Sequence, residues 1–161
     1  MKSCGTVVAR AYLGLGSNVG NRLGHLEFGL HELARCGSVL ARSPVIETEP
    51  VDCPGGGAFL NACVCLDTVL DPNSLLATAL RIESARGRRR RSRNEPRVLD
   101  IDLLLVDDIV ICEPGLTLPH PRMQDRWFVL EPLAAVAPGV IHPLLGLEVR
   151  QLLGRLHEGT G

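Results

Sequence analysis

Two aspartates, Asp100 and Asp102, lie in the otherwise apolar segment 98–106, which reads VLDIDLLLV. This composition predicts a buried strand, and side chains at i and i+2 of a strand leave the same face, with Cα atoms about 6.6 Å apart. Two aligned carboxylates repel each other and are costly to bury unless a cation joins them. Mg²⁺ suits such a pair, because water and substrate phosphates can complete its octahedral shell. The alternative, two solvated aspartates at a strand end, is less favoured because Asp107 and Asp108 already mark the other end of the segment.

An arginine-rich segment precedes these aspartates. Residues 86–97 carry seven arginines against one glutamate, a local charge of +6, whereas the rest of the chain carries −7. A basic island on an acidic body favours a compact anion over a long nucleic-acid backbone, although a solvated charged loop is the simpler alternative. Arg97 lies three residues before Asp100, so phosphate oxygens and Mg²⁺ could lie between the arginines and the carboxylates. This combination is typical of phosphoryl-type transfer.

Lysine chemistry is excluded by the composition. Sixteen of the 17 basic residues are arginines, Lys2 is the only lysine, and no GxxxxGK[ST] motif is present. A lysine Schiff base and a P-loop phosphate site are therefore ruled out.

Further candidate groups lie at two other points of the chain. In segment 59–69 the alternation predicts a strand with Phe59, Asn61, Cys63 and Cys65 on one face. An aromatic ring and an amide side by side can stack on a flat heterocycle and pair with its edge, although an asparagine near a strand start is more often a backbone cap. His120 lies among prolines with arginines nearby, which makes a phosphate contact plausible beside the simpler interpretation as a surface histidine.

The elements that must position these groups follow from periodicity and from turn residues. The pattern predicts strands over 7–18, 38–48, 59–69 and 98–106, a hairpin strand over 109–112, and helices over 23–34, 71–86, 127–136 and 148–156. Gly14, Gly16 and Gly20 indicate a turn where something approaches the backbone closely. The order β-α-β-β-α-β followed by a helical tail predicts an α+β fold of the ferredoxin-like (split βαβ) type, with an antiparallel or mixed sheet. We expect one domain over residues 1–161.

Composition limits the class of protein further. The chain has 161 residues, of which 45% are hydrophobic and 22% charged, which is typical of one globular domain. It contains no long apolar run, and no basic start leads into an apolar segment, so we expect no signal peptide and no membrane contact. Its six cysteines form no CxxC motif, so we expect a cytoplasmic protein with reduced thiols. We also expect a monomer. An RNA-binding module using the Arg86–Arg97 loop is the main alternative, but five aromatic residues are few for base stacking. A nucleotide-binding regulatory domain without catalysis is a third.

Several motifs, in this order, resemble the 6-hydroxymethyl-7,8-dihydropterin pyrophosphokinase family of folate biosynthesis. They are GLGSN (14–18), ETEP (47–50), FLNA (59–62), RIE (81–83), GRxR (87–90), PRVLDIDLLL (96–105), LPH (118–120) and DRxFVLEPL (125–133). The resemblance implies transfer of the β,γ-pyrophosphoryl group of ATP to the hydroxymethyl oxygen of the pterin, with release of AMP.

The resemblance also implies the roles of individual residues. The catalytic group would be Arg88, Arg97, Asp100 and Asp102, with the two aspartates holding two Mg²⁺ ions. ATP would contact Glu83, Arg88, Arg90, Arg97, Thr117, His120 and Arg126. The pterin would contact Thr48, Pro50, Val51, Phe59, Asn61 and Phe128. Segments 52–57 and 88–96 would close over both substrates. Asn94-Glu95 and Gly115 depart from the family pattern, so we expect weaker ATP binding than in typical relatives.

Overall fold

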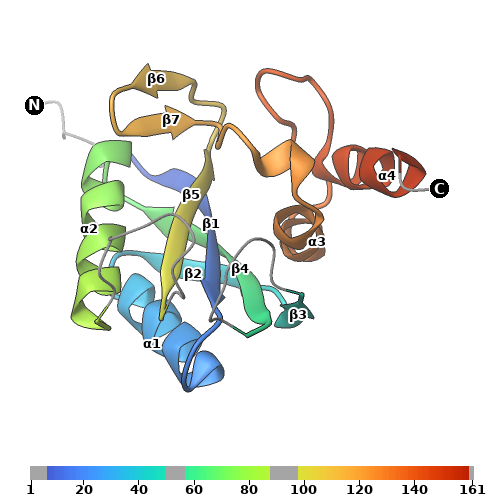
Figure 1. Cartoon of the computed structure of the whole chain (residues 1–161). Coiled ribbons are helices and arrows are strands. Elements are labelled where there is room, and N and C mark those ends of the chain that lie inside the picture. The colour runs from blue at the N-terminus through green and yellow to red at the C-terminus, as the bar shows by residue number, and fades with distance from the viewer. Residues whose placement is uncertain (1–6, 50–56, 88–97, 160–161) are drawn as a thin grey trace, which may run out of the picture.

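The computed structural model describes residues 7–49, 57–87 and 98–159, and it has an α+β architecture (Figure 1). The strands are β1 (Ala9–Ser17), β2 (Ser38–Arg42), β3 (Ile46–Thr48), β4 (Phe59–Thr68), β5 (Asp100–Val106), β6 (Ile111–Glu113) and β7 (Leu116–Leu118). The helices are α1 (Arg22–Ala34), α2 (Pro72–Ala85), α3 (Trp127–Val136) and α4 (Val149–Gly159), with a 3-10 turn over Met123–Asp125. The main sheet has the order β2-β4-β1-β5, β3 also pairs with β4, and every pairing is antiparallel.

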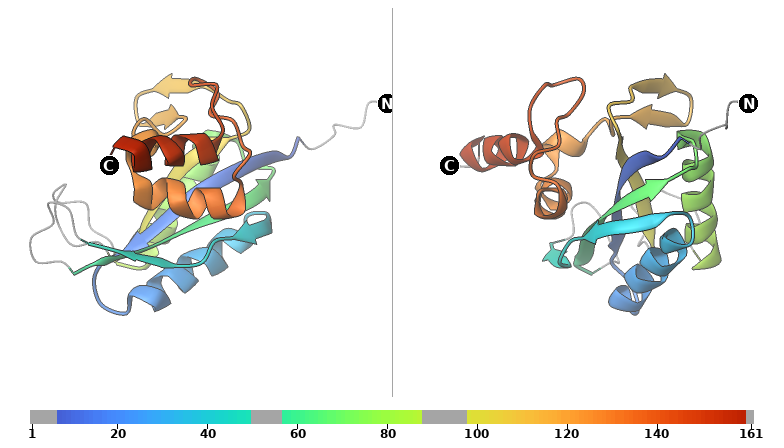
Figure 2. Two further views of the ribbon diagram at one scale, coloured as in Figure 1. Left: turned by 90° about the vertical axis from the view of Figure 1, so that its right-hand side faces the viewer. Right: turned by 180° about the vertical axis from the view of Figure 1, so that it is seen from behind.

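Helices cover both faces of this sheet. Figure 2 shows α1 and α2 on one side and α3 and α4 on the other. The first face packs a core that includes Leu13, Leu15 and Val64, and the second packs Tyr12, Cys63 and Cys65 against α3 and α4. The predicted alternation of segment 59–69 is therefore confirmed, because adjacent residues of a strand point to opposite faces. None of the helices in the described part of the chain is long and apolar enough to cross a membrane.

Local sequence signals account for the helix boundaries. Asp71 caps α2 by accepting a hydrogen bond from the Ser74 amide at 2.8 Å, and Pro72 occupies the first turn. Gly87, which follows the helix, has φ of +93°, a conformation that favours glycine. The predicted bounds of α2 and α3 agree with the structure because these signals act within a few residues.

The structure differs from the predicted strands in three places. The strand expected over 38–48 is divided into β2 and β3, since Pro44 lacks a backbone N–H and Ser43 bonds to the Cys63 amide through its side chain. The hairpin strand expected to pair with β5 instead forms a separate two-stranded sheet with β7, and the turn between them needs Gly115 at φ of +87°. Gly14 and Gly16 lie inside β1, within the strand predicted over 7–18, so the turn that these two glycines also indicated is wrong.

Candidate active site

The two aspartates lie on the sheet face that α3 and α4 partly cover. Ile101 and Leu103, which alternate with them, are 4% and 5% exposed in the core beneath α1 and α2. Asp100 and Asp102 are half-buried, and their partners across the ladder with β1 are Gly16 and Gly14. The predicted common face of the two carboxylates is confirmed, and the missing side chains of two glycines leave space beside them.

One row of residues runs across the sheet from Asn61 through Gly16 to Asp100. Neighbouring strands lie about 4.8 Å apart, so the Cα atoms of Asn61 and Asp100 are separated by about 10 Å. A Cβ added to Gly16 would lie 3.2 Å from the Asn61 side-chain oxygen, Oδ1. Within this row of the described sheet, Gly16 alone lies between the predicted pterin-binding amide and the predicted metal-binding carboxylate, and it has no side chain to separate them.

Asn61 belongs to a small polar and aromatic group where β3 and β4 pair. Its amide nitrogen, Nδ2, donates a hydrogen bond of 2.9 Å to Oγ1 of Thr48. Thr48 lies opposite Phe59 in the β3–β4 ladder, and a Cβ on Gly16 would also approach the Phe59 ring at 3.6 Å. The hydrogen bond leaves Oδ1 of Asn61 directed toward Gly16. The predicted residues Thr48, Phe59 and Asn61 are thus brought together.

His120 lies beside the carboxylate face. Its backbone N–H bonds to the carbonyl of Leu104 on β5 at 2.9 Å, and its Nδ1 accepts a hydrogen bond from the Arg122 amide at 3.2 Å. Because Nδ1 is an acceptor, the proton of the neutral ring is on Nε2. Burial, followed by the charge of Arg126, lowers the pKa of His120, whereas the charge of Asp100 acts in the opposite direction. The neutral imidazole therefore offers one N–H donor near Asp100.

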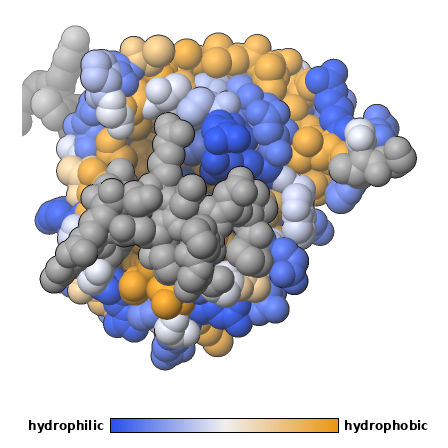
Figure 3. Space-filling model, viewed as in Figure 1, coloured by the Kyte–Doolittle hydropathy of each residue, from blue (hydrophilic) through white to orange (hydrophobic). Residues whose placement is uncertain are grey.

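Arg126 and Phe128 lie where α3 begins, on the same side of the sheet. Arg126 is the N-cap residue of α3, and its guanidinium carbon is 5.8 Å from the centre of the Phe128 ring. Helix α3 packs against β4, β1 and β3. Thr117 is exposed on β7, which packs against β5. On the face seen in Figure 3, a group of hydrophilic residues lies in the upper middle part.

Glu83 is more deeply buried than a simple ATP contact would require. Glu83 is 2% exposed, and its Oε2 accepts a hydrogen bond of 2.7 Å from the backbone N–H of Ile101. The carboxylate is thus joined to the strand that carries the two aspartates.

Five predicted site residues lie outside the described residues: Pro50, Val51, Arg88, Arg90 and Arg97. The two segments predicted to close over the substrates also lie wholly or largely outside them, as does the Asn94-Glu95 departure.

The donor set fits magnesium. Within residues 7–49, 57–87 and 98–159, no three His, Cys, Asp or Glu side chains form a group that could hold a metal ion alone. Two carboxylates on one strand face are what Mg²⁺ uses when water and phosphate oxygens supply the other ligands. A zinc-type site, which would need three or four protein ligands, does not match this arrangement.

The sequence did not predict the roles of two residues that support the site, Gly16 and Arg22. The predicted strand over 7–18 includes Gly16, but its glycine spacing was interpreted as a turn, and its place between Asn61 and Asp100 was not predicted. Arg22 bonds to the carbonyl of Ala58 at 2.8 Å and to the Glu47 carboxylate at 2.9 Å. It thereby joins α1 to the segments on both sides of residues 50–56, and no sequence signal indicated this contact.

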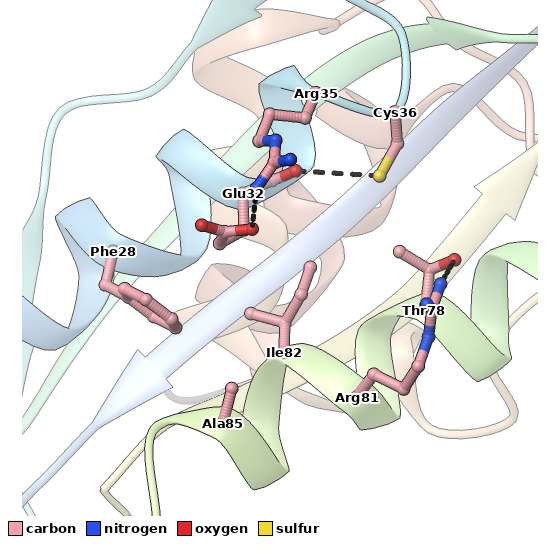
Figure 4. Close-up of a pocket in the computed structure, with 8 residues that line it drawn as sticks. All are labelled: Phe28, Glu32, Arg35, Cys36, Thr78, Arg81, Ile82 and Ala85. Atoms are coloured by element: carbon pink, nitrogen blue, oxygen red, sulfur yellow. Dashed lines mark hydrogen bonds and ion pairs between the residues drawn. The ribbon is translucent and has the colours of Figure 1, made fainter.

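A separate pocket of about 440 Å³ lies between α1 and α2, and Figure 4 shows its lining. Within it Arg35 pairs with Glu32 at 3.2 Å, and Arg81 donates to the Thr78 hydroxyl at 3.0 Å. None of the predicted site residues that the structure describes lines this pocket, and its helices cover the opposite face of the sheet from the aspartates. It is therefore distinct from the candidate active site.

The chain is similar in sequence to one described protein family and to several of its members. The family described as 7,8-dihydro-6-hydroxymethylpterin-pyrophosphokinase (HPPK) matches residues 12–138. The chain is 42% identical to the 2-amino-4-hydroxy-6-hydroxymethyldihydropteridine pyrophosphokinase of Methylorubrum extorquens, over 92% of this chain and 94% of that protein. It is 41% identical to the enzyme of the same name from Bacillus subtilis, over 81% and 79% of the two chains.

Solved structures support the fold. A triple mutant of Plasmodium falciparum HPPK-DHPS, crystallised with pteroate, superimposes with a TM-score of 0.78 at 18% identity. The match covers 96% of this chain, which spans only 44% of that longer one. Since the sequence match extends over most of the chain, the protein belongs to the 7,8-dihydro-6-hydroxymethylpterin-pyrophosphokinase family.

Proposed function

We propose that this chain transfers pyrophosphate from ATP to the hydroxymethyl group of 6-hydroxymethyl-7,8-dihydropterin, giving AMP and the pterin pyrophosphate, in tetrahydrofolate biosynthesis. Family membership supports the reaction class. The observation that carries the proposal is the row Asn61–Gly16–Asp100, which brings the side-chain amide predicted to pair with the pterin and the carboxylate predicted to bind magnesium to one face of the sheet. The order β2-β4-β1-β5 also supports a ferredoxin-like fold, since the third main strand lies between the first two.

The pterin ring would occupy the end of this row near β3. The bond to Thr48 uses the amide nitrogen of Asn61. Its side-chain oxygen, Oδ1, can therefore accept a hydrogen bond from an N–H on the ring edge. Phe59 and Phe128 offer aromatic surfaces on the same side of the sheet for stacking. Pro50 and Val51 complete the pocket in this proposal.

The phosphates of ATP would lie over Asp100 and Asp102, with two Mg²⁺ ions held by these carboxylates. Bound there, magnesium neutralises phosphate charge and orients the reacting oxygens. His120 donates its Nε2–H to a phosphate oxygen, which is possible because its lowered pKa keeps the ring neutral and its Nδ1 is already occupied. Arg126 adds positive charge near His120, and Thr117 contributes a hydroxyl at the ATP side.

The arginine-rich segment would close over the phosphates. In this proposal Arg88 and Arg97 neutralise the charge that develops during transfer, and Arg90 assists. Arginine suits this role because its planar, permanently charged group binds two phosphate oxygens at once. Exclusion of water by the closed segments would then favour transfer to the pterin over hydrolysis of ATP.

The test mixes the purified protein with Mg-ATP and 6-hydroxymethyl-7,8-dihydropterin and separates the nucleotides by chromatography. Pterin-dependent AMP without ADP is the expected result, because attack falls on the β-phosphorus. ADP, or AMP formed without the pterin, would refute the proposed reaction. Reactions lacking pterin or containing EDTA are the controls. The family match leaves the RNA-binding alternative without support.

We also propose a single domain, a monomer and a cytoplasmic location. The cysteines described by the structure, Cys36, Cys63, Cys65 and Cys112, are free thiols, which fits a reducing compartment. Gel filtration of the purified chain tests the monomer directly.

A further inference from the structure

Glu83 is a buried carboxylate that the proposed reaction does not yet explain. It lies near the end of α2, on the opposite side of the sheet from Asp100 and Asp102. It is joined to the strand of the site by the 2.7 Å hydrogen bond that its Oε2 accepts from the Ile101 amide. A buried carboxylate is costly unless it is well bonded, so its use as a backbone acceptor calls for a reason.

The position of β5 at the edge of the sheet supplies this reason. In an antiparallel sheet, consecutive N–H groups point alternately to the two neighbouring strands. Among the strands that the structure describes, β5 has a main-sheet neighbour only on the β1 side. The hydrogen bond to Glu83 shows that the Ile101 N–H points away from β1. Ile101 itself is 4% exposed, so water does not satisfy this amide. Glu83 thus provides the acceptor that a further strand would have provided.

Ile101 is the single residue between the two proposed metal-binding aspartates. Its backbone torsions set the directions in which the side chains of Asp100 and Asp102 leave the strand. A charged acceptor holds an amide more strongly than a neutral one, and it holds this amide at a fixed distance from α2. The link therefore restrains the spacing of the two carboxylates without touching a substrate.

We propose that Glu83 is a positioning residue, which fixes the β5 backbone at Ile101 so that Asp100 and Asp102 are held ready for magnesium. This inference rests on the proposed function. It assigns Glu83 a role that acts through Ile101 and that differs from the contact with ATP predicted from the sequence. The chain offers a set of variants that separates these roles.

Glu83→Gln retains an oxygen that can accept the Ile101 N–H, whereas Glu83→Ala removes it. Glu83→Asp keeps the charge but shortens the side chain by one methylene, and it serves if the alanine variant does not fold. Thr78→Ala is the matched control, because Thr78 is another buried polar residue of α2 whose hydroxyl bonds to its own helix, at the Ser74 carbonyl, and not to β5.

The first measurement is hydrogen exchange of the Ile101 amide by NMR, on protein without metal or substrates. We expect exchange at least ten times faster in Glu83→Ala, a smaller acceleration in Glu83→Asp, and rates within threefold of wild type in Glu83→Gln and Thr78→Ala. Unchanged Ile101 exchange in Glu83→Ala, or equally fast exchange in Glu83→Gln, would overturn the proposal.

The second measurement is the Mg²⁺ concentration that gives half-maximal AMP formation, together with the Kd for the pterin. Glu83→Ala should raise the half-saturating Mg²⁺ concentration at least fivefold and change the pterin Kd less than twofold. An equal rise in the half-saturating Mg²⁺ concentration and in the pterin Kd would indicate general damage to the fold and would also overturn the proposal. If the wild-type protein forms no AMP, the proposed function fails, whereas the exchange experiment still decides whether Glu83 fixes Ile101.

Discussion

The substitution Gly16→Ala tests whether the row across the sheet is the substrate site. Gly16 lies in β1 between Asn61 and Asp100, and its φ is not positive, so alanine can adopt this backbone without strain. The new methyl group would lie 3.2 Å from Asn61 Oδ1, which is closer than ordinary van der Waals contact. The Asn61 amide must therefore move by a few tenths of an ångström, and the methyl would cover the oxygen proposed to pair with the pterin.

The size of the effect follows from the loss of one hydrogen bond. A net contribution of about 1 to 1.5 kcal/mol corresponds to a rise of roughly five- to tenfold in the Kd of the pterin. Stability should change little, because the gain of up to about 1 kcal/mol from replacing a strand glycine offsets the local crowding.

Gly14→Ala is the matched control on the same strand and the same face. Its methyl would meet Leu104 Cδ1 at 3.6 Å, an ordinary contact, and it would not approach Asn61. Titration of each variant with 6-hydroxymethyl-7,8-dihydropterin by calorimetry should show the loss of affinity in Gly16→Ala alone, with a change below twofold in Gly14→Ala. Equal pterin affinity in Gly16→Ala and wild type would refute the location of the pterin beside Gly16.

Three further predictions concern the metal site, the pH dependence and the β3–β4 segment. Asp102→Ala should lower kcat by about a thousandfold or more while cooperative melting is retained, and activity close to wild type would contradict the magnesium assignment. Burial lowers the pKa of His142 below its ordinary 6.5, and its Nδ1 accepts two backbone N–H groups, so the unfolded chain binds the proton first. The contribution of His142 to the free energy of unfolding should therefore be fully present above pH 6.5 and should be lost as the pH falls below it. Denaturant unfolding from pH 7.5 to 5.5 should show a smaller decrease in the free energy of unfolding for His142→Asn than for the wild type. Arg22→Ala removes partly exposed bonds to Glu47 and Ala58, so the pterin Kd should rise by only about three- to fivefold, and an unchanged Kd would show that Arg22 does not support the pterin site.

Local signals in the sequence determined much of the framework. Asp71 followed by Pro72 is sufficient to start α2, because a cap and a first-turn proline act within one helical turn. The two-residue period of strands also determined that Asp100 and Asp102 share a face, since this depends only on their spacing. The same period correctly placed Leu60 on the opposite face of the strand from Phe59 and Asn61.

Contacts between distant segments were decided only by the tertiary structure. β6 pairs with β7 rather than β5, although the short connection to β5 favoured the opposite prediction. The Asp107 turn, with φ of 47°, releases the chain from the sheet edge, and this outcome depends on backbone geometry that the residue types alone do not specify.

For the candidate site as well, the sequence predicted the residue types, and the tertiary structure decided which of them lie together. The sequence by itself predicted a metal-binding carboxylate pair, an amide that pairs with the pterin ring and phosphate binding by arginine, because residue type and spacing carry that chemistry. Only the fold brought Asn61 beside Gly16 and Gly16 beside Asp100, since the register of three strands depends on how their buried faces fit against α1 and α2. It likewise joined Glu83 to Ile101, 18 residues away, because an edge strand leaves a buried amide that points away from the sheet and that a neighbouring helix must satisfy.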